Sequence, residues 1–261
     1  SGHAALGKPG QRMTAPSDMR PQGKRAIIVG AGLGGLSLGV RLQSAGIATT
    51  ILEARSKPGG CVSWQMHEGF TFDTGPVALT EPDSFAELWR LSGQDMAADV
   101  TLDPVTPLWR LSWPDGGSLD WVADDATMRQ EVARLDSRDL AGYQYLLDHG
   151  RDALREGFER LGRQAFPDIR ALLKALPTLV HHRGWRTIYG LISSHIGSPR
   201  LRQALSFEAV LAGGNPLETS ALNDWRHRLE QDSGLWHPRG GMNRLVMAMV
   251  ALFERIGGTI R

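Results

Sequence analysis

RAIIVGAGLGG (residues 25–35) decides the fold, because it sets a glycine-rich turn between a strand pattern and a helix pattern. Ala26–Val29 is a short, wholly apolar run that is typical of a buried parallel strand. An apolar helix pattern follows and ends at Gly46, and the β-branched run Ala48–Leu52 predicts a second strand. A strand-helix-strand unit of about thirty residues predicts the right-handed crossover of a doubly wound sheet.

The turn matches the pattern GxGxxG through Gly30, Gly32 and Gly35. The first glycine permits a tight turn, the second lets the backbone approach a pyrophosphate, and the third allows close helix–strand packing. Glu53 stands where the second strand ends and can accept hydrogen bonds from ribose hydroxyls, whereas its charge would repel the 2′-phosphate of NADP. These features favour a dinucleotide site on the helix N-terminus. A glycine-rich loop in a non-binding α/β unit, with Glu53 as a solvated carboxylate, remains the alternative.

Composition narrows the class of protein. The chain has 261 residues, of which 41% are hydrophobic and 22% charged, with a net charge of +1. This balance excludes a collagen-like or coiled-coil chain, and it offers no basic field for nucleic acid. The single cysteine, Cys61, excludes an internal disulfide and favours a reducing compartment. His181 and His182 are adjacent, so their side chains diverge on a helix, and His195 and His227 are isolated. No metal site is therefore expected, and no apolar run reaches the ~18 residues of a membrane span.

Further motifs resemble a known superfamily. LEARSKPGG (52–60) and EGFTFDTGP (68–76) carry an acid, a short spacer, Gly-Gly and a later Gly-Pro. PVTPLWRLSW (104–113), SFEAVLAGGNPLETSAL (206–222) and LWHPRGGMNRLVMAMVALFERIGG (235–258) follow in family order. The chain resembles the flavoprotein superfamily of amine oxidases and carotenoid desaturases, and within it the bacterial-type phytoene desaturases. The resemblance covers their N-terminal part only.

The resemblance implies FAD as the cofactor and a set of residues that bind it. These are Gly30, Ala31, Gly32, Gly34, Gly35, Glu53, Ala54, Arg55, Gly59, Gly60, Cys61, Gly75 and Pro76. Cys61 stands where the superfamily commonly has an Arg or Lys that faces the cofactor. An Asp that some members carry is matched here by Ala171, and the nearby Asp168 follows a proline as a helix-starting residue. No catalytic residue is therefore assigned.

The implied fold is α/β: a Rossmann-like FAD-binding domain with an inserted mixed α+β domain that binds substrate and associates with membrane. The C-terminal part of that fold is expected to be absent, so these residues alone are expected not to carry out the reaction. The expected divisions are 1–24, a disordered segment or expression remnant; 25–105, FAD-binding; 106–230, substrate and membrane; and 231–261, the return to the FAD-binding domain.

Local patterns predict the remaining elements. Residues 61–123 contain short strand-like runs and turn signals, which predict an antiparallel hairpin region. Residues 125–207 are mostly helical in pattern, and a further helix is expected over 219–231. An apolar face over 242–256 predicts a core helix that ends at a Gly-Gly pair, after which 259–261 begins a strand.

Residues 161–207 are unusually basic. They hold seven Lys and Arg residues against Asp168, seven minus one, or +6, with Trp, Tyr and aliphatic residues interleaved at helical spacing. Such a segment suits an anionic membrane surface, and the alternative is an ordinary helix with a solvated basic face. The resemblance favours the membrane, because a carotene must be drawn from lipid.

The predicted activity is FAD-dependent dehydrogenation of a carotene such as phytoene, with a hydride passing from an allylic C–H to the flavin. The alternatives are a later-step carotenoid desaturase, a carotene isomerase, a flavin amine oxidase, or a non-catalytic membrane-binding fragment. The expected partners are a lipophilic carotene and the inner face of the cell membrane, reached from the cytoplasm, with no nucleic acid. The sequence indicates no oligomeric state.

Overall fold

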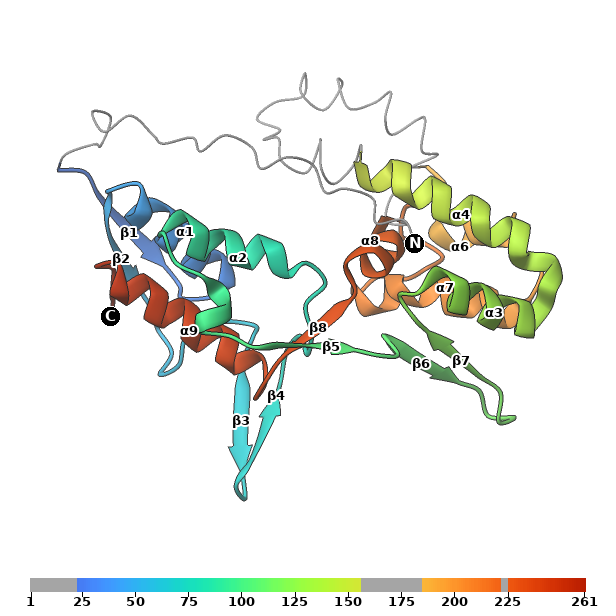
Figure 1. Cartoon of the computed structure of the whole chain (residues 1–261), viewed down its shortest axis with the longest axis horizontal. Coiled ribbons are helices and arrows are strands. Elements are labelled where there is room, and N and C mark those ends of the chain that lie inside the picture. The colour runs from blue at the N-terminus through green and yellow to red at the C-terminus, as the bar shows by residue number, and fades with distance from the viewer. Residues whose placement is uncertain (1–22, 156–184, 222–224) are drawn as a thin grey trace, which may run out of the picture. The chain divides into compact units, whose positions relative to one another are not determined.

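The computed structural model describes residues 23–155, 185–221 and 225–261 (Figure 1). Their backbone divides into two compact units. Unit 1 comprises the described parts of Ser1–Pro76, with Phe85–Val100 and Gly240–Arg261, and unit 2 comprises those of Val77–Ser84 and Thr101–Arg239. The expected disordered segment 1–24 lies outside the described residues except for its last two positions. The expected functional domains stay a prediction.

Unit 1 is built on a parallel sheet of β1 (Arg25–Val29), β2 (Ala48–Leu52) and β9 (Thr259–Ile260), in the order β1-β2-β9. The helix α1 (Leu33–Ser44) joins the first two strands, which pair with Val29 opposite Leu52. The predicted strand-helix-strand unit is therefore confirmed, and so is the strand that follows the last Gly-Gly pair.

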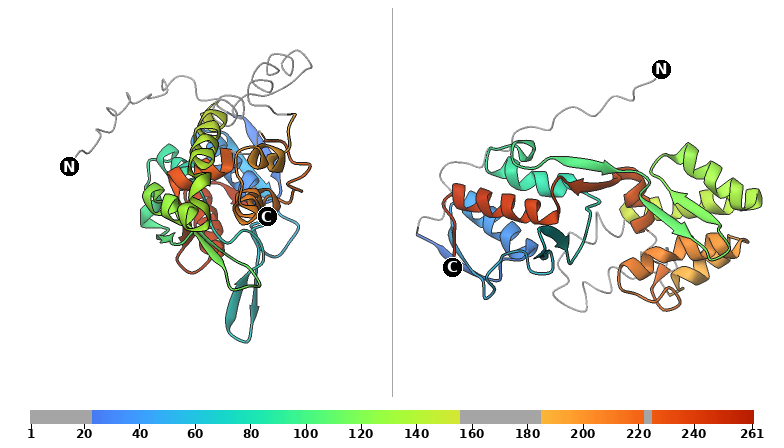
Figure 2. Two further views of the ribbon diagram at one scale, coloured as in Figure 1. Left: turned by 90° about the vertical axis from the view of Figure 1, so that its right-hand side faces the viewer. Right: turned by 90° about the horizontal axis from the view of Figure 1, so that it is seen from below.

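One face of this sheet is covered by helices. The helix α9 (Met242–Arg255) lies beside α1, as Figure 2 shows for the red and blue helices. Its apolar face is buried, as the pattern predicts. A Cβ on Gly39 of α1 would lie 2.9 Å from Ile51 Cδ1 and 3.1 Å from Phe253 Cε2. The absent side chain lets α1 approach both β2 and α9.

The other face of the sheet exposes apolar side chains. Ile27 is 71% exposed, Val29 87% and Leu52 40%. Parallel sheets normally bury both faces, which is why their strands are apolar throughout. In the part of unit 1 that the structure describes, one of the two faces is open.

The rest of unit 1 begins with a hairpin of β3 (Trp64–His67) and β4 (Phe70–Asp73), which turns through Glu68 and Gly69 at positive φ. The helix α2 (Pro82–Leu91), which belongs to unit 1 from Phe85 onward, and the short 3₁₀ helix η1 (Met96–Ala98) follow. These helices were not predicted within residues 61–123, where the sequence indicated an antiparallel hairpin region. Leu88 and Trp89 are buried on one face of α2, and the helix begins with Pro and Asp, which favour a first turn.

Unit 2 contains two antiparallel strand pairs. The hairpin of β6 (Trp109–Ser112) and β7 (Ser118–Trp121) confirms the pattern that predicted it. The strands β5 (Leu102–Val105) and β8 (Leu235–Pro238) also pair, although they lie far apart in the sequence.

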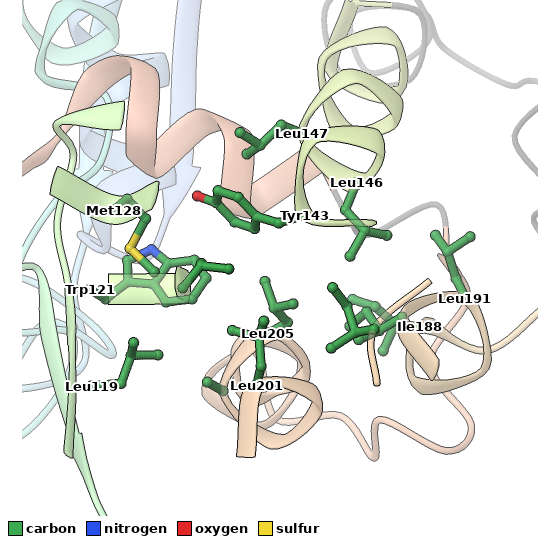
Figure 3. Packing of buried hydrophobic residues seen from close by; sticks show 14 of the residues in the cluster. Leu119, Trp121, Met128, Tyr143, Leu146, Leu147, Ile188, Leu191, Leu201 and Leu205 are labelled. Atoms are coloured by element: carbon green, nitrogen blue, oxygen red, sulfur yellow. The ribbon is translucent and has the colours of Figure 1, made fainter. Parts of the chain in front are cut away.

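Helices make up the remainder of unit 2. They are α3 (Asp125–Asp136), η2 (Ser137–Asp139), α4 (Leu140–Ala153), α6 (Ile188–Ser193), α7 (Pro199–Leu211) and α8 (Trp225–Ser233). Figure 3 shows Trp121, Tyr143, Leu146 and Leu201 converging on their common core. The helical character predicted for 125–207 is confirmed where that range is described. Among the described residues, no helix combines the length and apolarity that a bilayer crossing demands.

The helix expected over 219–231 begins later than predicted. Thr219 accepts a hydrogen bond from the Ile188 N–H, and the Ala221 N–H donates to Arg186. These residues satisfy their backbone groups by pairing with another segment, so the described helix starts at Trp225.

Candidate functional site

The glycine-rich turn after β1 takes the conformation that its sequence predicts. Gly30 has φ +99°, and its N–H donates to Leu52 O at 2.7 Å, at the end of β2. A Cβ on Gly35 would lie 2.0 Å from Gly30 O, closer than any side chain tolerates. Gly34, by contrast, has open space around the position of its missing Cβ. Glycine is thus required at the first and last of these positions and tolerated at Gly34.

The N-terminus of α1 has the features of an anion-binding site. Its N-cap residue is Gly32, which supplies no side-chain acceptor, and its first turn carries no acidic residue. The first N–H groups of a helix have no partner within the helix, and the helix dipole adds partial positive charge there. An uncapped helix of 12 residues that follows a glycine turn fits the pyrophosphate of a dinucleotide.

A second glycine turn lies against the first. Gly59 and Gly60 have φ +117° and +61°, and the Gly59 N–H donates to Ala31 O at 2.8 Å. A Cβ on Gly60 would lie 3.2 Å from the Cα of Gly32. The two turns, which the resemblance assigned to one site, are in direct backbone contact.

The Glu53 carboxylate binds the first glycine turn and its own strand end. Oε2 accepts a hydrogen bond of 2.6 Å from the Ala31 N–H, and Oε1 accepts one of 2.9 Å from the Arg55 N–H. The Arg55 N–H and then the Ala31 N–H lower the pKa of this carboxyl below its ordinary value, so Glu53 stays ionised at neutral pH. The Arg55 guanidinium donates to Gly60 O at 3.2 Å. Glu53, Ala54 and Arg55 therefore form the strand end that holds both turns.

A third segment closes on the second turn. A Cβ on Gly75 would lie 2.0 Å from Cys61 O, so the Gly75-Pro76 segment approaches the backbone that follows Gly60. The Cys61 thiol is free and exposed. The residues predicted to bind cofactor thus all lie in unit 1, on the first glycine turn and the start of α1, the strand end Glu53–Arg55, the Gly59–Gly60 turn with Cys61, and the Gly75-Pro76 segment.

Sequence reasoning missed one polar residue in this region. Asp73 lies within a motif that carried the resemblance, and its Oδ2 accepts a hydrogen bond of 3.0 Å from the Met242 N–H. The sequence feature that could have identified Asp73 is an acidic residue placed between an apolar strand pattern and a glycine. Asp168 and Ala171 lie outside the described residues. Within the described ranges, no group of three or more His, Cys, Asp or Glu side chains could hold a metal ion.

Comparison with known proteins gives close relatives. A "Phytoene desaturase (lycopene-forming)" of a Paracoccus species is 45% identical over 238 residues, covering 91% of this chain and 48% of that protein. A protein of the same description from Pantoea ananas is 40% identical over 237 residues, with the same coverage. The chain spans about half the length of the curated relatives it matches.

Solved structures share the fold. An oxidoreductase from Methanosarcina mazei superposes with a TM-score of 0.59 at 16% identity, over 91% of this chain and 50% of that one. Cyclohexylamine oxidase from Brevibacterium oxydans gives 0.56 at 16% identity, over 91% and 51%. At this identity the likeness supports the predicted α/β fold alone.

A family model sets the classification. The model described as flavin containing amine oxidoreductase matches residues 33–261, a range that includes α1 and α9. It also includes every predicted cofactor-binding residue except Gly30, Ala31 and Gly32. The predicted resemblance and the predicted flavin cofactor are thereby confirmed. The chain belongs to the family of flavin-containing amine oxidoreductases.

Proposed function

We propose that this chain forms the FAD-binding part of a carotene desaturase. The observation that carries the cofactor assignment is the contact between two glycine turns beside the uncapped N-terminus of α1, with the ionised Glu53 bonded to the first of these turns. The pyrophosphate would bind the first N–H groups of α1. Each carboxylate oxygen of Glu53 accepts one backbone hydrogen bond and keeps lone-pair capacity for the ribose hydroxyls.

The proposed reaction is dehydrogenation of a carotene such as phytoene. The identity to two phytoene desaturases favours this substrate class over amines. When bound, FAD supplies the acceptor for a hydride from an allylic C–H of the polyene. The described residues bind and orient it, and none is assigned as a base. Because a developing cation is delocalised over a polyene, geometry rather than a strong base would supply the rate.

The same proposal assigns a role to unit 2. Unit 2 would bind the substrate and associate with the inner face of the cell membrane. Its support is an exposed Trp185, together with exposed Phe207, Val210 and Leu211 on α7, which follow the helical spacing of one face. Much of the basic segment 161–207 lies outside the described residues.

The cofactor assignment is tested by titrating the purified chain with FAD while following flavin fluorescence. ADP-ribose, which carries both the pyrophosphate and the ribose pair, should compete with FAD, whereas riboflavin should not. Absence of FAD binding would refute the assignment. Binding of FAD without competition by ADP-ribose would refute the proposed placement of its pyrophosphate and ribose.

The substrate class is tested on the FAD-loaded chain. Phytoene in detergent micelles should raise its unfolding temperature relative to empty micelles, because a ligand that binds the native state stabilises it. Putrescine should have no effect. A shift with putrescine and none with phytoene would favour an amine oxidase.

A further inference from the structure

The helix α9 is held at both ends by carboxylates from other segments of unit 1. At its N-terminal end Asp73 Oδ2 accepts a hydrogen bond of 3.0 Å from the Met242 N–H. At its C-terminal end Asp99 pairs with Arg255 and also accepts from Trp89 Nε1 at 2.6 Å. The two carboxylates anchor the same helix at different places, so their effects can be compared.

Asp73 supplies the N-terminal cap that the N-cap residue of α9 itself lacks. The N-cap residue is Gly241, which has no side chain to accept a hydrogen bond from the first turn. Gly241 has φ +98°, and a Cβ there would lie 3.0 Å from Asp73 Oδ2. Glycine is therefore the residue that admits the carboxylate to the helix end. An anion at this end is also stabilised by the dipole of a helix of 14 residues.

The capped end of α9 supports the second glycine turn. A Cβ on Gly59 would lie 3.4 Å from Val246 Cγ1, one helical turn after Met242. From Asp73 the chain runs into Thr74, whose N–H donates to Ser63 O at 2.9 Å, just beyond that glycine turn. The carboxylate thus links the end of β4 to the start of α9, and both of these segments adjoin the Gly59–Gly60 turn, the helix through Val246 and the strand end through Thr74.

We propose that Asp73 is a positioning residue for flavin binding, an inference that rests on the proposed function. By capping α9 it would keep the helix start, and with it the Gly59–Gly60 turn, ordered before the cofactor arrives. Without the cap, the first turn of α9 frays in the free protein. Only the ordered fraction then binds, and the apparent Kd for FAD rises by the inverse of that fraction.

The experiment compares three variants of the full chain. Asp73→Ala removes the cap, Asp73→Asn keeps an acceptor oxygen without the charge, and Asp99→Ala removes the anchor at the other end of α9. We expect Asp73→Ala to weaken FAD binding by about threefold to tenfold, the range that loss of a helix cap supports. Asp73→Asn should recover most of the affinity. Asp99→Ala should lower the unfolding temperature but leave the Kd within about twofold of wild type.

A second measurement follows the helix itself. Hydrogen exchange of the FAD-free chain should show faster exchange over residues 240–248 in Asp73→Ala, and not in Asp99→Ala. The proposal is overturned if Asp73→Ala binds FAD as wild type does, or if both alanine variants weaken binding alike. Unchanged exchange at the start of α9 would also overturn it. If Asp73→Ala does not fold, Asp73→Asn is compared with wild type instead. Its lost charge should weaken FAD binding slightly and speed exchange over residues 240–248, and wild-type values of both overturn the positioning role of the charge.

The outcomes that refute the proposed function differ from those that refute the role of Asp73. A wild-type chain that binds no FAD refutes the function, whereas the exchange measurement on the free chain still reports whether Asp73 caps α9. FAD binding by wild type, with all variants equal to it, refutes only the role of Asp73.

Discussion

Glu53 and Ala31 are joined by a hydrogen bond of 2.6 Å from the Ala31 N–H to Glu53 Oε2. This bond connects the end of β2 to the glycine turn after β1, so the acid that would bind ribose is held against the turn that would bind pyrophosphate. The same carboxylate accepts from the Arg55 N–H. Its orientation is therefore fixed by the backbone before any ligand binds.

Replacing Glu53 by Ala is expected to weaken FAD binding by about tenfold or more, because a charge-assisted acceptor for ribose is lost. Glu53→Gln keeps an acceptor oxygen without the charge and should bind with intermediate affinity. The dissociation constants are measured by flavin fluorescence, with circular dichroism to check folding. Equal affinity in wild type and Glu53→Ala would remove this residue from the site.

Gly35 and Gly34 offer a matched pair of substitutions. Gly35→Ala would bring a Cβ to 2.0 Å from Gly30 O, so we expect a loss of roughly 3 kcal/mol of stability or a failure to fold. In Gly34→Ala the added Cβ has open space around it, and the position lies within a helix. This substitution should therefore be neutral or stabilising by up to ~1 kcal/mol. Urea unfolding of both variants measures the difference. Similar stabilities would contradict the close approach of Gly30 and Gly35.

The sequence predicted the parts of unit 1 that depend on local pattern. The bounds of β2, Ala48–Leu52, agree with the prediction because a β-branched run between Gly46 and an acid has few other solutions. The turn after β1 was predictable because glycine alone permits its backbone. The first site turn was predicted from the spacing of its glycines, whereas the Gly59–Gly60 turn and the Gly75-Pro76 segment came from motif resemblance.

The features that were missed depend on contacts between distant residues. Asp73 and Met242 are 169 positions apart, and no periodicity in either segment indicates that they meet. The pairing of β5 with β8 is equally non-local, so the sequence could not predict it. The helix α2 was missed for another reason, because it is short and lies among strand-like runs.

Acid should destabilise the chain partly through Asp136. The Arg138 guanidinium, and then the Arg138 N–H, lower the pKa of Asp136 to about 2, from an ordinary value of 3.8. A depressed pKa stabilises the folded state above the unfolded pKa, and this contribution is lost as pH falls from about 4 toward 2. Asp136→Asn should therefore lower the unfolding temperature by about 2 °C at pH 6 and by less at pH 3.

Thermal unfolding of wild type and Asp136→Asn across this range checks the expectation. Asp232→Asn, on the exposed pair with Arg228, serves as a control for a general loss of charge. A difference between wild type and Asp136→Asn that stays constant from pH 6 to pH 3 would contradict the assignment.

Membrane docking is expected to depend on Trp185. This indole is 68% exposed in unit 2, and Trp is favoured at the interface between lipid and water. Co-sedimentation with liposomes should require acidic lipid and weaken with salt, because the screening length shrinks as ionic strength rises. Arg200 should add little, since Asp115 already neutralises it. We expect Trp185→Ala to weaken liposome binding by about tenfold, near the lower end of the range for withdrawing a large apolar side chain from lipid.

Phe70→Ala is the matched control for this prediction, because Phe70 is exposed to a similar extent, 67%, but lies on the hairpin of unit 1. Its loss should leave liposome binding unchanged if docking belongs to the Trp185 surface. Equal reduction by both variants would indicate general adhesion of apolar side chains. Equal pelleting of wild type with neutral and acidic vesicles would remove the electrostatic contribution, because a basic segment distinguishes lipids only by their charge.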